Sequence, residues 1–444
     1  MDPQEDPEIE ARFLSDWSGL SVGRPREVHR PRSTEEVAAL VRRCHEEGLC
    51  ITVQGGMTGV AGGAVPAQGD VVINLERMNA IEEIDALEGV MQVQAGATLQ
   101  QVQEAAEAAG WMFAVDLGAR GSCQVGGNAA TNAGGIRVIR YGTMRDSVLG
   151  VEAVLANGQV VSSLTRLVKN STGLEPRFLF IGTEGTLGII TRLTLRLHPP
   201  MGQAAVAWVA ASRFEALPVL LRQLKKKLGS GLCAFEFMSG QYVRTACELT
   251  GATVPVQTEG AWHVLIEAAG AAGQCLDEPL QEALMHALEG GDIDDCAMAA
   301  SQAHRESFWR IREAIPEVLT HLKPPATLDI GLPWARTAEY VQKVAAELQA
   351  RLPQAQHLFL GHLGDNNLHL ISGPLDEAGV HAVDEIAYGA LRGCGGTVSA
   401  EHGVGRLKKD YLAVSRTPEE IALMRTLKQA LDPAGILNPG RIID

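Results

Sequence analysis

The sequence is poor in cysteine, in long apolar runs and in positive charge. Its 444 residues include eight cysteines, none in a CxxC pair, so we expect no disulfide framework, and a reducing cytoplasm fits best. The first ten residues, MDPQEDPEIE, do not resemble a signal or transit peptide. No apolar run reaches the roughly 18 residues of a membrane span. With 38 basic and 53 acidic residues the net charge is -15, which argues against nucleic acid and anionic lipid as partners.

What is present is a globular composition with an excess of glycine. Hydrophobic residues make up 46% of the chain, enough for a sizeable core, and 48 residues are glycine. The pattern predicts an α+β fold with a boundary at Pro199-Pro200. We expect domains at 1–199 and 200–415, with 416–444 as a C-terminal segment that returns to the first domain.

Capping signals and apolar periodicity mark several elements. Ser33 and Thr98 each precede a predicted helix, with Glu36 and Gln101 three residues later. Asn157-Gly158 predicts a hairpin turn between strands 148–156 and 159–163. Beyond residue 200, predicted strands at 204–210, 233–238 and 262–267 alternate with helices near 213–228, 276–289, 300–315 and 335–351. A last helix is predicted at 417–431.

Most of the glycine lies in three segments of the first domain. Each follows an apolar stretch, and their backbone N–H groups and small polar side chains suit a long phosphate-bearing cofactor. The spacing matches neither the dinucleotide-binding motif nor the P-loop, and tight turns in a β-rich domain are the alternative for any single loop. The candidate cofactor residues are Gln54, Gly55, Gly56, Met57, Thr58, Gly59, Gly118, Gly121, Ser122, Gly126, Gly127, Asn128, Thr131, Asn132, Gly134, Gly135, Glu184, Gly185, Gly188 and Ile189.

These segments resemble the FAD-linked oxidase family of the vanillyl-alcohol oxidase and p-cresol methylhydroxylase superfamily. The resemblance rests on DLGARGSCQVGGNAATNAGG, on FLFIGTEGTLGIIT and on the tail LDPAGILNPGRI, which contains Asn438. It implies a two-subdomain FAD-binding domain, an α+β substrate (cap) domain and a C-terminal segment that returns to the flavin. Some relatives attach FAD through a histidine in the first loop. Because this loop has Met57 and Thr58 instead, we expect non-covalent FAD.

A pair of histidines forms the sharpest chemical signal. His362 and His369 are symmetric about Asp365-Asn366, so a hairpin turn there would place them directly opposite each other on neighbouring strands. Glu401 is a candidate third ligand, and two histidines with one carboxylate form a catalytic set for zinc, manganese or iron. Spacing alone fits two ordinary strand histidines as well.

The same segments resemble the metal-dependent D-2-hydroxyglutarate and D-lactate dehydrogenases of the family. The motifs are GHLGDNNLH and SAEHGVG. The resemblance implies metal ligands His362, His369 and Glu401, with zinc or manganese as the ion, and His402 as the catalytic base. It also implies that Arg312 binds the substrate carboxylate, for which a guanidinium is well suited.

Two positions depart from the hydroxyglutarate-type members. Thr327 stands where they carry a lysine, and Ile371 where they carry an asparagine. Both family residues help to hold the substrate, so Thr327 is the candidate substrate contact here. We therefore expect a D-lactate-like monocarboxylate to be favoured, with Lys323 as a replacement cation left open and D-2-hydroxyglutarate or D-malate as the alternative.

The predicted reaction is the oxidation of a D-2-hydroxy acid to a 2-oxo acid, with hydride passing to flavin N5 and the hydroxyl proton to His402. The electron acceptor is open among oxygen, a quinone, cytochrome c and an electron-transfer flavoprotein, and a homodimer is the commonest soluble assembly. Two other classes stay open: a metal-free flavin alcohol oxidase and a non-catalytic flavoprotein subunit.

Overall fold

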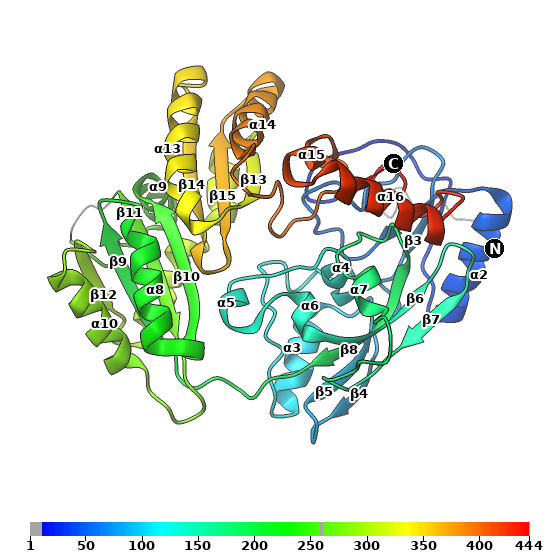
Figure 1. The fold of residues 1–444 in the computed structure, drawn as a ribbon, viewed down its shortest axis with the longest axis horizontal. Coiled ribbons are helices and arrows are strands. Elements are labelled where there is room, and N and C mark those ends of the chain that lie inside the picture. The colour runs from blue at the N-terminus through cyan, green and yellow to red at the C-terminus, as the bar shows by residue number, and fades with distance from the viewer. Residues whose placement is uncertain (1–10, 258–260, 444) are drawn as a thin grey trace. The chain divides into compact units, whose positions relative to one another are not determined.

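The computed structural model describes residues 11–257 and 261–443, and their backbone forms two compact units. The first unit contains the described residues up to Gly135, the segment Tyr141–Pro200 and the chain from Glu401 onward. The second contains Met201–Ala400 and the short segment Ile136–Arg140. Helices and strands alternate in both units, as expected for the α+β class (Figure 1).

The first unit has two sheets. A parallel sheet has the order β1 (Glu27–His29), β3 (Val71–Asn74) and β2 (Ile51–Gln54). An antiparallel sheet has the order β4 (Ile81–Asp85), β5 (Val90–Gln94), β8 (Ile189–Arg196), β6 (Val148–Val154) and β7 (Val160–Ser163). The Asn157-Gly158 turn joins β6 and β7, with Gly158 at φ 77°, so the predicted hairpin is confirmed.

Two helices of the first unit begin at the predicted caps. These are α2 (Thr34–Glu47) and α3 (Leu99–Ala108). Thr98 and Gln101 form a reciprocal capping box, an arrangement that stabilises a helix start by about 1 kcal/mol. Ser33 caps α2, but the Glu36 carboxylate accepts the Arg32 N–H rather than that of Ser33.

The remaining helices of this part of the chain are short, apart from the last one. They are α4 (Val125–Ala130), α6 (Met144–Ser147), α7 (Arg177–Phe180), η3 (Lys409–Tyr411), α15 (Leu412–Ser415) and α16 (Pro418–Leu431). The short helix α5 (Val138–Tyr141) lies mainly in the second unit. After α16, the tail joins the parallel sheet. Leu437 forms a parallel bridge with Ile51, and both side chains are fully buried in one apolar core that is shared by the two sheets.

The second unit is one sheet of seven strands. Their order is β12 (Asp295–Met298), β9 (Ala205–Ala211), β11 (Trp262–Ala268), β10 (Leu232–Ser239), β14 (Gln356–His362), β15 (Asn367–Gly373) and β13 (Ala326–Gly331), with every pair antiparallel. The predicted strands in this region are confirmed to within a residue or two at each end.

Helices cover both faces of this sheet. One layer contains α8 (Ala216–Leu228), α10 (Asp277–Glu289), α13 (Trp334–Arg351) and α14 (Glu377–Leu391) (Figure 1). The other contains α9 (Gly240–Thr250), α11 (Gln302–Arg312) and α12 (Ile315–His321). The helix predicted near 300–315 is α11, and α12 follows it as a separate helix. Two single turns, η1 (Gly229–Gly231) and η2 (Leu363–Asp365), complete the unit.

Side-chain alternation decides what each sheet face carries. Successive residues of a strand point to opposite faces, so His362, His369 and Glu236 share one face with Met238, Leu360 and Ile371. The apolar members of this face pack against Tyr242 of α9 and Ile311 of α11. The polar members therefore lie at the end of an otherwise apolar layer.

Candidate active site

The three glycine loops of the first unit, residues 54–63, 118–135 and 182–188, converge through their backbones. A Cβ on Gly56 would lie 1.9 Å from the carbonyl oxygen of Ser122, so the first loop touches the second where only glycine fits. Glu184 in the third loop donates its N–H to the carbonyl oxygen of Ala130 over 2.8 Å. The side chain of Asn438 then joins the first loop to the third, accepting from Val53 N–H and donating to Glu184 O.

Strained backbone marks the same loops. Six described non-glycine residues have a positive φ, and four of them lie in these loops or contact them: Met57, Asn132, Glu184 and Asn438, with values of 55°, 53°, 50° and 43°. Side-chain-bearing residues in this region each cost of order 1–3 kcal/mol and persist where the surrounding structure holds them, most often at functional sites. All four were predicted cofactor residues.

Buried acceptors without a protein partner lie at these loops. Within the described residues, Gln54 Oε1, Gln124 Oε1 and Asn128 Oδ1 are buried and accept no hydrogen bond. Orphaned buried oxygens are rare in native structures, and a bound ligand is one reason for them. FAD carries hydroxyl, imide and amino donors along its length, so the residues present fit that cofactor.

Not every predicted cofactor residue turns its side chain toward a ligand. Thr131 donates to the carbonyl oxygen of Gly127 within its own turn, and Ile189 is buried at the start of β8. Gly188 packs against Phe180, and a side chain at this position would clash, because its Cβ would lie 2.7 Å from the Phe180 ring.

Glu184 contacts the segment that carries the predicted base. Its two carboxylate oxygens accept the N–H groups of Val404 and Gly405 over 2.6 and 2.8 Å. Burial raises the pKa of Glu184, and these N–H groups offset only part of that rise. His402 lies two residues before Val404 and is half-buried, so Glu184 anchors the backbone next to it.

The two histidines of the second unit are neighbours, but the expected pairing is wrong. His369 pairs with Leu360 rather than with His362, because η2 inserts a helical turn before Asn366, which has φ 74°. His362 and His369 therefore lie diagonally on one face of β14 and β15. Their ring centroids are 5.3 Å apart and the rings are nearly perpendicular.

Glu401 joins the two histidines in a group that could hold a metal ion. A carboxylate oxygen of Glu401 and one ring nitrogen each of His362 and His369 all lie within 4.8 Å of one another. Glu401 directly follows Ala400, whose N–H donates to the Asp329 carboxylate over 3.1 Å. Asp329 pairs with His369 across β13 and β15, so this buried aspartate holds the chain just before the third ligand.

Glu236 connects the histidine pair to the predicted carboxylate clamp. Its Oε1 lies 2.7 Å from His362 Nδ1, and its Oε2 accepts from Nε and Nη2 of Arg312 over 2.8 Å. All three side chains are at least nine-tenths buried. Burial alone would raise the pKa of Glu236, but the charges and hydrogen bonds of His362 and Arg312 outweigh it and hold that pKa below its usual value.

The donor set suits a divalent metal. A histidine that ligates a metal usually shares its other ring nitrogen with a carboxylate, as His362 does with Glu236. Two imidazoles and one carboxylate fit zinc or manganese.

Sequence reasoning missed Glu236 and Asp329. Each is an acidic residue in an otherwise apolar strand, in the runs LCAFEFMS and ATLDIG. A buried carboxylate requires a partner, so the charge within these strands was the signal that could have found them.

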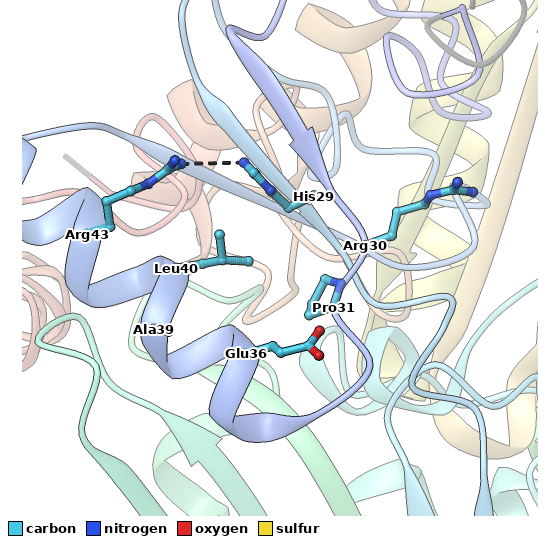
Figure 2. Close-up of a pocket in the computed structure, with 7 residues that line it drawn as sticks. All are labelled: His29, Arg30, Pro31, Glu36, Ala39, Leu40 and Arg43. Carbon is cyan, nitrogen blue, oxygen red and sulfur yellow. Dashed lines mark hydrogen bonds between the residues drawn. The ribbon is translucent and has the colours of Figure 1, made fainter. Parts of the chain in front are cut away.

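A cavity of about 440 Å³ lies elsewhere in the first unit, between β1 and α2 (Figure 2). Its lining includes His29 and Arg43, both of which contact Glu27, and none of the predicted site residues. Figure 2 shows the Arg43 side chain directed at His29 across the top of this cavity.

In the described residues, no helix combines the length and apolar character needed to cross a membrane.

Comparison with known proteins agrees with both parts of the chain. Residues 25–163 match the FAD binding domain family, and residues 202–442 match the C-terminal domain of FAD linked oxidases. The structure is similar to that of p-cresol methylhydroxylase with substrate bound, with a TM-score of 0.80 and 17% identity over 99% of this chain and 93% of that one. The fold is thus of the vanillyl-alcohol oxidase type.

Three curated relatives cover nearly all of the chain. A Bos taurus protein named D-2-hydroxyglutarate dehydrogenase, mitochondrial, is 39% identical over 96% of this chain and 78% of its own length. D-2-hydroxyglutarate dehydrogenase of Xanthomonas citri pv. viticola is 37% identical over 97% and 91%. A Schizosaccharomyces pombe protein with a D-lactate dehydrogenase name is 32% identical over 100% and 86%.

The chain belongs to the FAD-linked oxidase family. The predicted family, fold class and enzyme class, an FAD-dependent D-2-hydroxyacid dehydrogenase, are confirmed.

Proposed function

We propose that this enzyme oxidises D-2-hydroxyglutarate, a dicarboxylic D-2-hydroxy acid, to the corresponding 2-oxo acid. The observation that carries the proposal is the set Glu236, His362 and Arg312, which brings a metal-ligand histidine and a buried guanidinium onto one carboxylate. The names of the bovine and Xanthomonas relatives favour this substrate over the D-lactate-like monocarboxylate expected from Thr327 and Ile371.

Each residue has one role in this proposal. Arg312 binds the C1 carboxylate through its guanidinium, and a ring nitrogen of His402 takes the hydroxyl proton. The three glycine loops would hold FAD, which would supply the hydride acceptor for the C2 hydrogen. The glycine loops hold it without a covalent bond, because the segment 54–63 contains no histidine.

A divalent metal is part of the proposal. His362, His369 and Glu401 would hold zinc or manganese, which would lower the pKa of a substrate hydroxyl bound to it. The carboxylate of Glu236 and the backbone attachment of Ala400 to Asp329 keep two of these ligands in position.

A D-lactate dehydrogenase is the second candidate. It is favoured by the position of Thr327, which faces the isoleucine Ile371 across β13 and β15 and offers a distal carboxylate no charge. The relative from Schizosaccharomyces pombe supports this candidate through its name.

The decisive experiment is an anaerobic titration of the purified yellow protein with D- and L-2-hydroxy acids, followed by flavin bleaching. D-2-hydroxyglutarate should reduce the flavin fastest, and its L-enantiomer should not reduce it. Faster reduction by D-lactate supports the second candidate. A chain that no acid reduces is a non-catalytic flavoprotein subunit, and full activity in metal-free protein indicates a metal-free flavin oxidase.

A homodimeric state and a cytoplasmic location are proposed from the sequence alone, and the electron acceptor stays open. Rates of flavin reoxidation by oxygen, a quinone, cytochrome c and an electron-transfer flavoprotein identify the acceptor.

A further inference from the structure

Glu236 shares its carboxylate between two groups that the proposed reaction uses separately. Oε1 contacts Nδ1 of His362, and Oε2 accepts from the Nε and Nη2 edge of Arg312. The relative exposures are 1% for the Glu236 side chain, 8% for His362 and 5% for Arg312, so bulk water does not screen the interaction.

The contact with His362 selects one tautomer. A carboxylate only accepts hydrogen bonds, so Nδ1 must carry the proton and Nε2 of the neutral ring must carry the lone pair. A metal ion is bound through that lone pair. Glu236 thereby determines which nitrogen of His362 is available for coordination.

The contact with Arg312 orients the guanidinium. Glu236 occupies the edge formed by Nε and Nη2, so a second carboxylate is left the other edge, which includes Nη1. Among the described residues, none accepts a hydrogen bond from Nη1 of Arg312. The backbone at this point is held as well, because the Tyr242 hydroxyl donates to the carbonyl oxygen of Arg312 over 2.9 Å.

We propose that Glu236 is a positioning residue that couples metal binding by His362 to carboxylate recognition by Arg312. The inference rests on the proposed function, because it requires a metal ion and a substrate carboxylate. Because one carboxylate orients both groups, metal binding and substrate carboxylate binding both depend on the Glu236 side chain. A change of that side chain should weaken both.

The test measures metal affinity without turnover. FAD-loaded protein is stripped of metal and titrated with Mn²⁺ and with Zn²⁺ by calorimetry, as wild type, Glu236→Gln and Glu236→Asp. The glutamine amide keeps the volume but presents N–H to one of the two partners. If it faces Nδ1 of His362, the ring proton must move to Nε2, the nitrogen that binds metal. Metal affinity should fall about 10- to 100-fold in Glu236→Gln.

The order of the two variants separates positioning from a merely structural role. Aspartate keeps the negative charge and the acceptor-only character, so Glu236→Asp should lose less metal affinity than Glu236→Gln. A structural role predicts the reverse, because glutamine preserves the packing and aspartate leaves a gap. KM for the hydroxy acid should rise in both variants, with flavin content unchanged.

Glu267→Gln is the matched control. Glu267 is a buried glutamate of β11, the strand next to β10, and it pairs with Arg137 rather than with a histidine. The metal affinity of the Glu267→Gln variant should equal that of wild type. If Glu236→Gln alone does not fold because Arg312 is left buried without a countercharge, the double variant Glu236→Leu/Arg312→Met removes both the charge and the acceptor for Nδ1 of His362, and its metal affinity should show the same loss.

The outcomes are distinct. Wild-type protein that binds neither ion overturns the metal part of the proposed function and this inference with it. Wild type that binds metal while Glu236→Gln binds it equally well overturns this inference alone.

Discussion

Thr327 and Ile371 lie directly opposite each other on β13 and β15, two residues from Asp329 and His369 along the same strands. They share a sheet face with His369, the proposed metal ligand, yet Thr327 is exposed and Ile371 is buried. This pair therefore offers one hydroxyl group and one apolar surface at the position where we propose that the substrate is held beyond its C2 atom.

Adding a cation at this pair should shift specificity toward dicarboxylates. We expect Thr327→Lys to raise kcat/KM for D-2-hydroxyglutarate relative to D-lactate by roughly twofold to fivefold, because an exposed ion pair contributes up to about 1 kcal/mol. Thr327→Met is the matched control, since methionine has a similar length and no charge. An equal shift in both variants would mean that side-chain length, rather than charge, is responsible.

Loss of one metal-ligand histidine should remove metal without removing flavin. We expect His369→Ala to lower Mn²⁺ or Zn²⁺ affinity at least about 100-fold and to abolish turnover, with the FAD-to-protein ratio unchanged. The flavin should stay because the glycine loops belong to the first unit.

His357→Gln is the control for that experiment. His357 lies on β14 as well, but on the opposite face of the strand, where it contacts Ser372 and the carbonyl oxygen of Leu352. Its metal content should match that of wild type. A wild-type rate for metal-free His369→Ala would contradict the assignment of the ligands.

The flavin should be released by denaturation. Met57 and Thr58 occupy the loop in which some family members carry a histidine, and neither residue forms a flavin bond. Acid precipitation should leave the yellow colour in the supernatant and a polypeptide of 47.3 kDa in the pellet. Colour that stays with the pellet would instead indicate attachment through another residue.

The free energy of unfolding should decrease as the pH is lowered, because one buried histidine resists protonation in the folded protein. His263 accepts a hydrogen bond from Trp208 Nε1 over 3.1 Å, and burial, helped by the charge of Arg244, lowers its pKa to about 4. The unfolded chain takes up this proton near pH 6.5, before the folded chain does. The contribution is therefore complete above pH 6.5 and is lost as the pH falls toward 4, by ~2 kcal/mol between pH 7 and 5.

His263→Asn isolates this effect. Asparagine offers an oxygen near the position of Nδ1 and does not titrate. Urea unfolding of wild type and variant at pH 7 and pH 5 gives the difference, in which all other titrating groups cancel. Equal pH dependence in the two proteins would show that folding does not lower the pKa of His263.

Much of the secondary structure could be predicted from local patterns in the sequence. The caps at Ser33 and Thr98, the Asn157-Gly158 turn and the strand periodicity depend on neighbouring residues, and each is present at the expected place. The pairing of His369 with Leu360, rather than with His362, was not predictable from the symmetry of the sequence. It results from the helical turn η2, for which the neighbouring residues gave no signal.

The candidate site was only half visible in the sequence. Its histidines and arginine came from motifs, whereas Glu236 is 76 positions from Arg312 and 126 from His362. Such a contact is set by the pairing of β10 with β14, which is a property of the complete sheet. Its only trace in the sequence is an acidic residue in an apolar strand.

The hydrogen bond from Val53 to Asn438 spans 385 positions of the chain. During synthesis, the first glycine loop is therefore made long before the amide that joins it to the third loop, and the whole second unit is translated in between. Because closing such a long loop is entropically unfavourable, the flavin cradle is a late structure in folding. A ribosome-bound chain that ends before Asn438 would lack this link between the first loop and the third, and newly made enzyme would acquire its colour only after release.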